Sequence, residues 1–431
     1  MGHDEGKEER LFVENVRERR RLFFLPVYAA VFFSLSLQVM VQLIVPLWAI
    51  ELGASPLMLG LVVGAAYLLP IFFSISTGGM IDQFGARNVL WWSALVSIAM
   101  ALFYPFFAML SVLLLLQLVN GQVQNMNWIA AQSYAAKLGK ETGHSAHVNL
   151  FSFAVNGGTF AGPMLLGLLW DHAGQQAAFF AVSGWAACLA LATALLPREQ
   201  LNVEVQRGTE GAKGESIWRG MLPRWDDYRR ALRLLLIPTV VLVVYGTFMR
   251  LSAFSMRSSF YLVYLEELAY PATLIAFLYS FSQLCSVCSP LLVSFFNRWL
   301  AGSRLLVLAI VVGILPITLT PLFTDFWPLL ILAGVAGIGM GMTLPLLITI
   351  LSGSVEGKDQ GVAAGLRIAV NSLASTVIPL VFGLLAEGFG LGVSFYLVGL
   401  LLLLPMLVVI PRLFGRLRQM EPSPAKDGGS S

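Results

Sequence analysis

Long apolar segments joined by short polar turns make up nearly the whole chain. A helix of about 20 apolar residues crosses the roughly 30 Å of hydrocarbon in a bilayer, and twelve stretches reach that length. They lie near 23–50, 57–79, 89–108, 110–134, 148–170, 176–196, 234–262, 272–296, 305–323, 327–352, 362–386 and 391–411. The pattern therefore predicts an all-α polytopic membrane protein with twelve transmembrane helices, six in each half of the chain.

The two halves of the chain repeat one another at an offset of about 215 residues. The longest shared motif is Pro-x-x-x-Gly-Leu-Leu-x-acid-x-x-Gly, which runs over 163–174 and again over 379–390. A membrane chain with two like halves is typical of transporters in which two bundles move about one site. We therefore predict two pseudo-symmetric six-helix bundles.

The repeat and the polar segments divide the sequence into five parts. We expect a cytoplasmic N-terminal segment over 1–22, the first bundle over 23–196 and a cytoplasmic linker over 197–233. The second bundle should cover 234–412, and 413–431 should form a disordered cytoplasmic tail.

The composition excludes a soluble globular protein, because 57% of the residues are hydrophobic and only 12% are charged. Lys and Arg gather in alternate turns and in both termini, whereas the remaining turns carry only acids. By the positive-inside rule both termini are cytoplasmic, in a multi-pass protein of the plasma (cell inner) membrane. The net charge of +3 is a basic rim facing anionic lipid. The expected partners are membrane lipids and a small-molecule substrate, with no nucleic acid, and the chain is expected to be a monomer.

Nothing in the sequence indicates a cofactor, a metal site or an enzyme. The three cysteines, Cys188, Cys285 and Cys288, all lie inside predicted spans, where they are read as inert. No His-Glu-x-x-His motif and no pair of membrane-embedded acids is present. A lipid-modifying membrane enzyme is the alternative of a different class, and a sensor that has lost transport is another.

The turn between the second and third spans carries the most specific motif. Gly78, Asp82, Gly85 and Arg87 form the pattern Gly-x-x-x-Asp-x-x-Gly-x-Arg. This pattern resembles the signature loop of the major facilitator superfamily, although Gln83 stands where that family often has a base. The resemblance implies that Asp82 pairs with a helix end and latches the cytoplasmic side, so these four residues are assigned to gating.

A second element lies in the fifth span, where Gly158, Gly162 and Pro163 form Gly-x-x-x-Gly-Pro. It is similar to a family element associated with exporters that work by antiport. Small residues at this spacing let two helix backbones approach closely, and the proline permits a bend. Generic helix packing explains the spacing almost as well, so the element favours export only slightly.

No Asp or Glu lies within a span, away from its ends. A proton-coupled carrier needs a titratable group at membrane depth. Among the histidines, His144 and His147 lie near the cytoplasmic entrance of the fifth span and are the candidates for coupling.

The charges that do lie within spans are all positive: Arg250 and Arg257 in the seventh span and Arg367 in the eleventh. An arginine at the centre of a membrane costs about 3 kcal/mol, so these three imply compensation by water, neutral polar groups or an anion. Arg257 lies close enough to the outer surface to extend toward water or toward Glu266.

Amide side chains complete the set of candidate substrate-binding residues. They are Gln38 and Gln42 in the first span, Gln124 and Asn127 in the fourth, and Asn371 one helical turn after Arg367. Such amides also hydrogen-bond helices together without touching a ligand. Together the residues favour a secondary transporter that moves a small organic, anionic or amphipathic solute by rocker-switch alternating access, with export slightly preferred over uptake or exchange.

Overall fold

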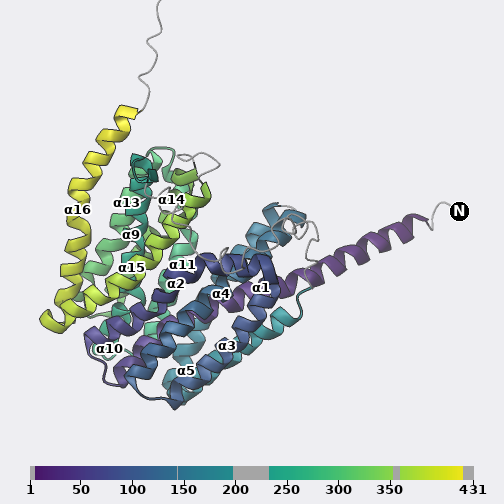
Figure 1. Cartoon of the computed structure of the whole chain (residues 1–431), viewed down its shortest axis with the longest axis horizontal. Coiled ribbons are helices and arrows are strands. Elements are labelled where there is room, and N and C mark those ends of the chain that lie inside the picture. Colours follow the sequence, from purple (N-terminus) through teal and green to yellow (C-terminus); the bar gives the residue numbers. More distant parts are fainter. Residues whose placement is uncertain (1–4, 143, 198–232, 353–359, 421–431) are drawn as a thin grey trace, which may run out of the picture. The chain divides into compact units, whose positions relative to one another are not determined.

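The computed structural model describes residues 5–142, 144–197, 233–352 and 360–420, and in these ranges every regular element is a helix (Figure 1). The first half contains α1 (Glu5–Glu51), α2 (Pro56–Phe84), α3 (Ala86–Phe106), α4 (Leu110–Thr142) and α5 (His144–Ala194). The second half contains α9 (Pro238–Ser258), α10 (Phe260–Glu267), α11 (Ala272–Cys288), α12 (Pro290–Phe296), α13 (Gly302–Leu319), the short 3-10 helix η2 (Thr320–Leu322), α14 (Phe326–Ser352), α15 (Gln360–Phe389) and α16 (Leu391–Met420).

The twelve predicted spans all fall on these helices. Ten helical segments of the described residues are long and apolar enough to cross a membrane. One of them, Phe153–Ala194, has 42 residues and is roughly 63 Å long, so it accounts for two crossings. Its helix α5 is interrupted by the non-helical backbone of Gly174, at φ 81° and ψ 173°. The twelfth span is α4, whose many amides lower its hydropathy.

Two predicted segments differ at their ends. The helix α1 begins at Glu5, within the predicted N-terminal segment 1–22, and α16 continues to Met420, within the predicted tail 413–431. Nearly all of the predicted linker 197–233 lies outside the described residues.

The helices assemble into two compact units. The first consists of residues 1–54, 61–222 and 265–283, and the second of residues 55–60, 223–264 and 284–431. Each unit therefore contains a short segment from the opposite half of the sequence: 265–283 in the first and 55–60 in the second. These two segments hold the starts of α11 and α2.

Serine side chains mark the points where two predicted spans divide into shorter helices. The hydroxyls of Ser258 and Ser259 both donate to the carbonyl oxygen of Ser255, at 3.4 and 2.5 Å, where α9 gives way to α10. Ser289 likewise donates to the carbonyl oxygen of Ser286 at 2.6 Å, immediately before Pro290 opens α12. Hydrogen bonds of this kind compete with the helical ladder, and proline removes one of its donors.

Glycines allow close helix packing in the first unit. A Cβ at Gly158 would lie 2.5 Å from the carbonyl oxygen of Phe32, and one at Gly162 would meet the side chains of Ser36 and Met40. The Gly-x-x-x-Gly spacing therefore lets α5 pack directly on α1. Gly121 of α4 approaches the backbone of Ala66 in α2 just as closely.

An aromatic cluster fills the core of the second unit. Phe382, which is fully buried, stacks on Phe260 with ring centroids 4.1 Å apart and meets Phe395 edge-on at 4.9 Å. These rings join α15 to α10 and α16.

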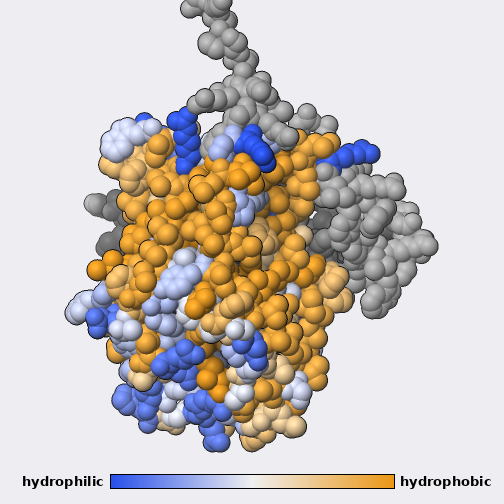
Figure 2. Space-filling view, turned by 90° about the vertical axis from the view of Figure 1, so that its left-hand side faces the viewer, coloured by the Kyte–Doolittle hydropathy of each residue, from blue (hydrophilic) through white to orange (hydrophobic). Residues whose placement is uncertain are grey.

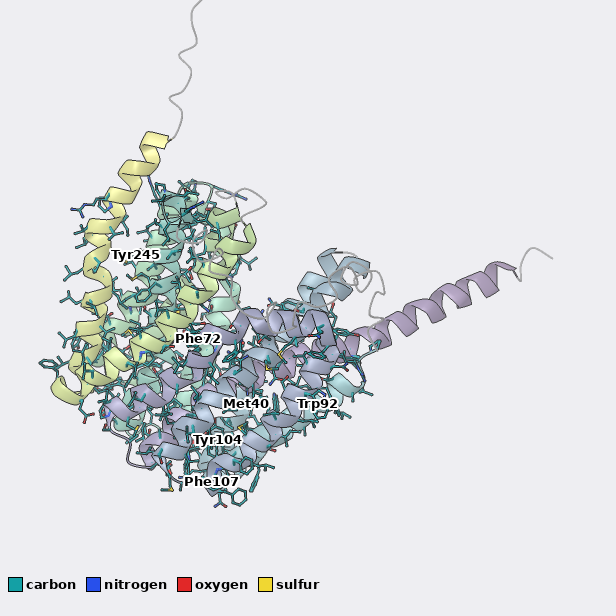
Figure 3. The ribbon with its side chains drawn as sticks, viewed as in Figure 1. Met40, Phe72, Trp92, Tyr104, Phe107 and Tyr245 are labelled. Carbon is teal, nitrogen blue, oxygen red and sulfur yellow. The ribbon has the colours of Figure 1, made fainter. Side chains whose placement is uncertain are left out.

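The outer surface of the helices is largely apolar, as expected for residues that face lipid. Figure 2 shows the face that carries α16, where apolar side chains cover a broad area and hydrophilic ones gather toward its ends. Phe72 of α2, Trp92 of α3 and Phe107, just after α3, are exposed, whereas Tyr104 is buried inside the first unit (Figure 3).

Candidate functional site

Three arginines lie together in the second unit. Arg250 lies near the middle of the membrane-spanning segment Pro238–Glu267, and its Nε atom is buried without a hydrogen-bond partner. Arg367 and Arg257 are close enough to Arg250 to repel its charge electrostatically. Arg250 and Arg367 come from α9 and α15, which pack against one another.

Arg257 differs from Arg250 in its surroundings. It is only 3% exposed, so of its two expected placements the extension to water is wrong. Its guanidinium instead lies over the ring of Phe254, 5.8 Å from the centroid. At this distance an arginine gains a cation–π interaction, which compensates part of the cost of burial.

Asn371 adds a polar group on the same helix face as Arg367. The two residues are four positions apart in α15, so their side chains lie one above the other. The Oδ1 atom of Asn371 is buried and has no hydrogen-bond partner. Guanidinium donors and an unsatisfied amide therefore occur together in this unit.

The described residues of the second unit contain only two acids, Asp325 and Glu387, and both are exposed. No carboxylate of this part of the chain is buried beside the arginines. The charge of Arg250 is therefore not offset by any carboxylate among the described residues of its unit.

Polar side chains of α4 form a buried network in the first unit. Tyr104 of α3 donates to the Oε1 atom of Gln117 at 2.7 Å, Asn120 donates to the same oxygen at 3.4 Å, and Gln124 donates to Asn120 at 3.4 Å. Farther along, Asn127 donates to the hydroxyl of Ser97 in α3 at 2.8 Å. The bonds of Tyr104 and Asn127 hold α4 to α3, whereas Gln124 bonds to Asn120 within α4 itself.

Oxygen atoms of several amides in the first unit remain unsatisfied. The Oε1 atom of Gln124 and the Oδ1 atom of Asn127 are buried without a partner. Gln42 donates to the hydroxyl of Tyr67 at 3.0 Å, and its own Oε1 atom is also buried and unpaired. Gln38 lies one turn before Gln42 on α1 and is half-buried.

The predicted gating turn joins α2 to α3. Gly85 takes a positive φ of 83° immediately before α3, a conformation that favours glycine, while a Cβ at Gly78 would meet nothing within 4 Å. Arg87 donates from Nη2 to the carbonyl oxygen of Ala194 at 3.0 Å, at the C-terminal end of α5. A cation at a helix C-terminus is favourable, so Arg87 ties the turn to α5.

Three predicted site residues have side chains outside the described part of the structure. The backbone of Asp82 lies in α2, and those of His144 and His147 lie in α5. Their proposed roles in gating and coupling remain predictions. Among the described residues, no group of three His, Cys, Asp or Glu side chains is placed to hold a metal ion.

Two acids cap helices, although the sequence suggested them only as markers of the orientation in the membrane. In the first unit, Asp171 of α5 accepts hydrogen bonds from the backbone amides of Ala272 and Thr273, at 2.9 and 2.7 Å. In the second unit, Glu387 of α15 accepts one from the amide of Leu57 at 3.1 Å. The motif repeated in the two halves was the signal that could have identified them.

Comparisons with known proteins agree with this architecture. The model of the family described as the Major Facilitator Superfamily matches residues 27–318 and 297–430. A search of curated proteins found no match.

Several solved transporter structures share the fold. The nucleoside transporter NupG has 14% identity and a TM-score of 0.72, with 90% of this chain and 98% of that chain covered. A POT family transporter in complex with a thioalcohol-conjugated peptide has 13% identity and a TM-score of 0.68, with 91% and 96% covered. A bacterial homolog of the human lysosomal transporter Spinster has 14% identity and a TM-score of 0.66, with 92% and 96% covered.

Proposed function

The chain belongs to the Major Facilitator Superfamily of membrane transporters, and we propose that it moves a small organic anion, or an amphipathic solute with an anionic end, by alternating access. The substrate-binding residues proposed in the second unit are Arg250, Arg257, Arg367 and Asn371. Gln38, Gln42, Gln124 and Asn127 are proposed to contribute hydrogen bonds from the first unit.

The unpaired charge of Arg250 is the observation that supports an anionic solute. Its Nε atom is buried without a partner, Arg367 and Arg257 repel it, and the two acids among the described residues of its unit are exposed. A positive group at membrane depth is costly unless something compensates it. A bound anion would satisfy the guanidinium by charge-assisted hydrogen bonds, which arginine forms readily with carboxylates and phosphates.

The direction and the membrane are proposed from the sequence. The element formed by Gly158, Gly162 and Pro163 favours export, and the distribution of Lys and Arg favours cytoplasmic termini in the plasma membrane. Coupling through His144 or His147 is the proposed route if a proton is exchanged. Organic-anion uptake or exchange is the second possibility.

Transport in proteoliposomes tests the solute class. Purified protein should be reconstituted and assayed by counterflow with three groups of labelled solutes: organic anions, nucleosides and short peptides. We expect the wild type to take up an organic anion and Arg250→Ala to take it up at least tenfold more slowly. Removing one charge-assisted contact costs about 1.5–3 kcal/mol.

The matched control is Arg304→Ala, which removes an exposed arginine of the same unit. It should transport like the wild type. If Arg250→Ala transported an organic anion at the wild-type rate, the proposed site would be refuted. Transport of neutral solutes alone would refute the anionic class, and binding without counterflow would identify a sensor.

A further inference from the structure

The motif repeated at 163–174 and 379–390 places a carboxylate against a helix from the opposite half of the sequence. We propose that Asp171 and Glu387 form a paired conformational latch: each holds the N-terminus of such a helix, and their release opens the protein on the side of the acid-only turns. This latch acts whatever solute is carried, so it goes beyond the proposed function and can be tested without a solute.

Asp171 satisfies two backbone donors at the start of α11. The first amides of a helix have no partner within the helix, and the N-terminus carries a partial positive charge. The Oδ1 atom of Asp171 accepts from Ala272 and its Oδ2 atom accepts from Thr273. One carboxylate thus neutralises both amides and the helix dipole, although it lies about 100 residues earlier in the chain.

The glycine of the motif lets the two helices come close enough for this contact. Gly167 lies one helical turn before Asp171, and a Cβ there would be 2.6 Å from the Cβ of Ala276 and 2.7 Å from the carbonyl oxygen of Ala272. A side chain at Gly167 would therefore push α11 away from α5. One turn deeper on α11, the hydroxyl of Ser280 donates to the carbonyl oxygen of Phe160 at 3.3 Å.

The second copy of the motif repeats the arrangement at α2. Glu387 accepts from the amide of Leu57, and a Cβ at Gly383, one turn earlier, would lie 2.5 Å from the carbonyl oxygen of Pro56. The chain turns after each acid at a glycine with positive φ, 81° at Gly174 and 83° at Gly390.

The two copies differ in one respect that makes the proposal testable. The amide of Met58 corresponds in the repeat to that of Thr273, but it donates to the hydroxyl of Ser55 at 3.3 Å. Glu387 therefore satisfies one donor, where Asp171 satisfies two. Loss of Asp171 should therefore promote opening more than loss of Glu387 does.

The exposure of these bonds indicates a reversible contact. The bonds from Leu57 and Thr273 are exposed and the bond from Ala272 is part-buried. Water can replace an exposed acceptor at modest cost, so the helix ends can separate and rejoin. Contacts within a packed core lack this property.

Alkylation of a buried cysteine measures the opening. In a variant with Cys188, Cys285 and Cys288 replaced by serine, Ser280→Cys puts a thiol at a fully buried position on α11, against α5. The reaction rate with N-ethylmaleimide in nanodiscs, without solute, then reports separation of the two helices.

We expect Asp171→Ala to speed alkylation about tenfold, which corresponds to roughly 1.4 kcal/mol of lost capping. Asp171→Asn keeps one acceptor and should give an intermediate rate. Glu387→Ala, which frees a single donor, should speed it about threefold, and the double variant should give about the product of the two.

Two controls separate a latch from a local structural role. Glu267→Gln removes an exposed carboxylate of the first unit and should leave the rate unchanged. As the second control, the amides of Ala272 and Thr273 should exchange their hydrogens with solvent faster in Asp171→Ala than in the wild type. Faster exchange with an unchanged alkylation rate would overturn the latch and leave a simple helix cap. Equal effects of the two acids, or none from Glu387→Ala, would overturn the pairing.

Discussion

Replacing Arg250 with methionine is expected to stabilise the protein while it abolishes anion transport. Methionine reaches about as far as the Nε atom of arginine, carries no charge and adapts its shape to irregular spaces. The substitution removes a guanidinium whose Nε atom is buried without a partner, and it removes the repulsion from Arg367 and Arg257. If Arg250 belongs to the substrate site, as we propose, its charge is kept at the expense of stability.

The size of the effect follows from the position of the side chain. Arg250 lies 12 residues after Pro238, which is roughly 18 Å along the helix and close to mid-membrane. A central arginine costs about 2.5–3.5 kcal/mol. Since Arg250 is half-buried and partly solvated, we expect a gain of about 1–2 kcal/mol. For a chain of 431 residues that corresponds to a rise in Tm of about 1–2 °C.

Arg257→Met is the matched comparison, because both arginines lie on α9 and seven residues apart. Arg257 is held over the ring of Phe254, and a desolvated cation–π contact contributes about 1–2 kcal/mol. It also takes part in further interactions. This variant should therefore lower Tm by about 1–2 °C.

Tryptophan fluorescence during heating in detergent measures both changes, and the ten tryptophans of the chain provide the signal. The two variants should shift Tm in opposite directions under identical conditions. A lower Tm for Arg250→Met would refute the reasoning, because it would mean that the wild-type guanidinium is already compensated by its neighbours.

Three further variants test the packing of the helices. Phe382→Ala should lower stability by about 2–4 kcal/mol through loss of two ring contacts and formation of a cavity, whereas Phe389→Ala, at an exposed site, should change Tm by less than about 1 °C. Gly121→Val should greatly reduce the yield of folded protein in size-exclusion chromatography, because its Cβ would meet backbone atoms of α2. Tyr104→Phe removes the donor to Gln117 and should cost about 1–2 kcal/mol in thermal unfolding, and an unchanged Tm would contradict the buried network.

The sequence predicted the helices well because lipid imposes a simple rule on length and polarity. The twelve spans include α4, which the length of the stretch 110–134 predicted although the hydropathy of this helix is low. The division of the seventh span at Ser259 could not be predicted, since it depends on serine hydroxyls that compete for backbone carbonyls, and the same hydroxyls also occur inside continuous helices.

The candidate site was predicted less completely than the fold. The sequence identified the three arginines by their cost in lipid, and the structure brings Arg250 and Arg367 together. The sequence could not identify the roles of Asp171 and Glu387, because each acid caps a helix that lies more than 100 positions away in the chain. The repeated motif contains both acids and could have drawn attention to them, but only the packing of distant helices shows what they bind.

The amides of α4 also affect how the protein is made. Gln122 and Asn125 donate to Thr77 and Ser74 of α2, and Asn127 donates to Ser97 of α3. Because these partners emerge from the ribosome before α4 does, they are already in the bilayer when it arrives. The translocon would therefore release α4 into lipid that already contains its hydrogen-bond partners, and the order of synthesis would become part of the folding pathway.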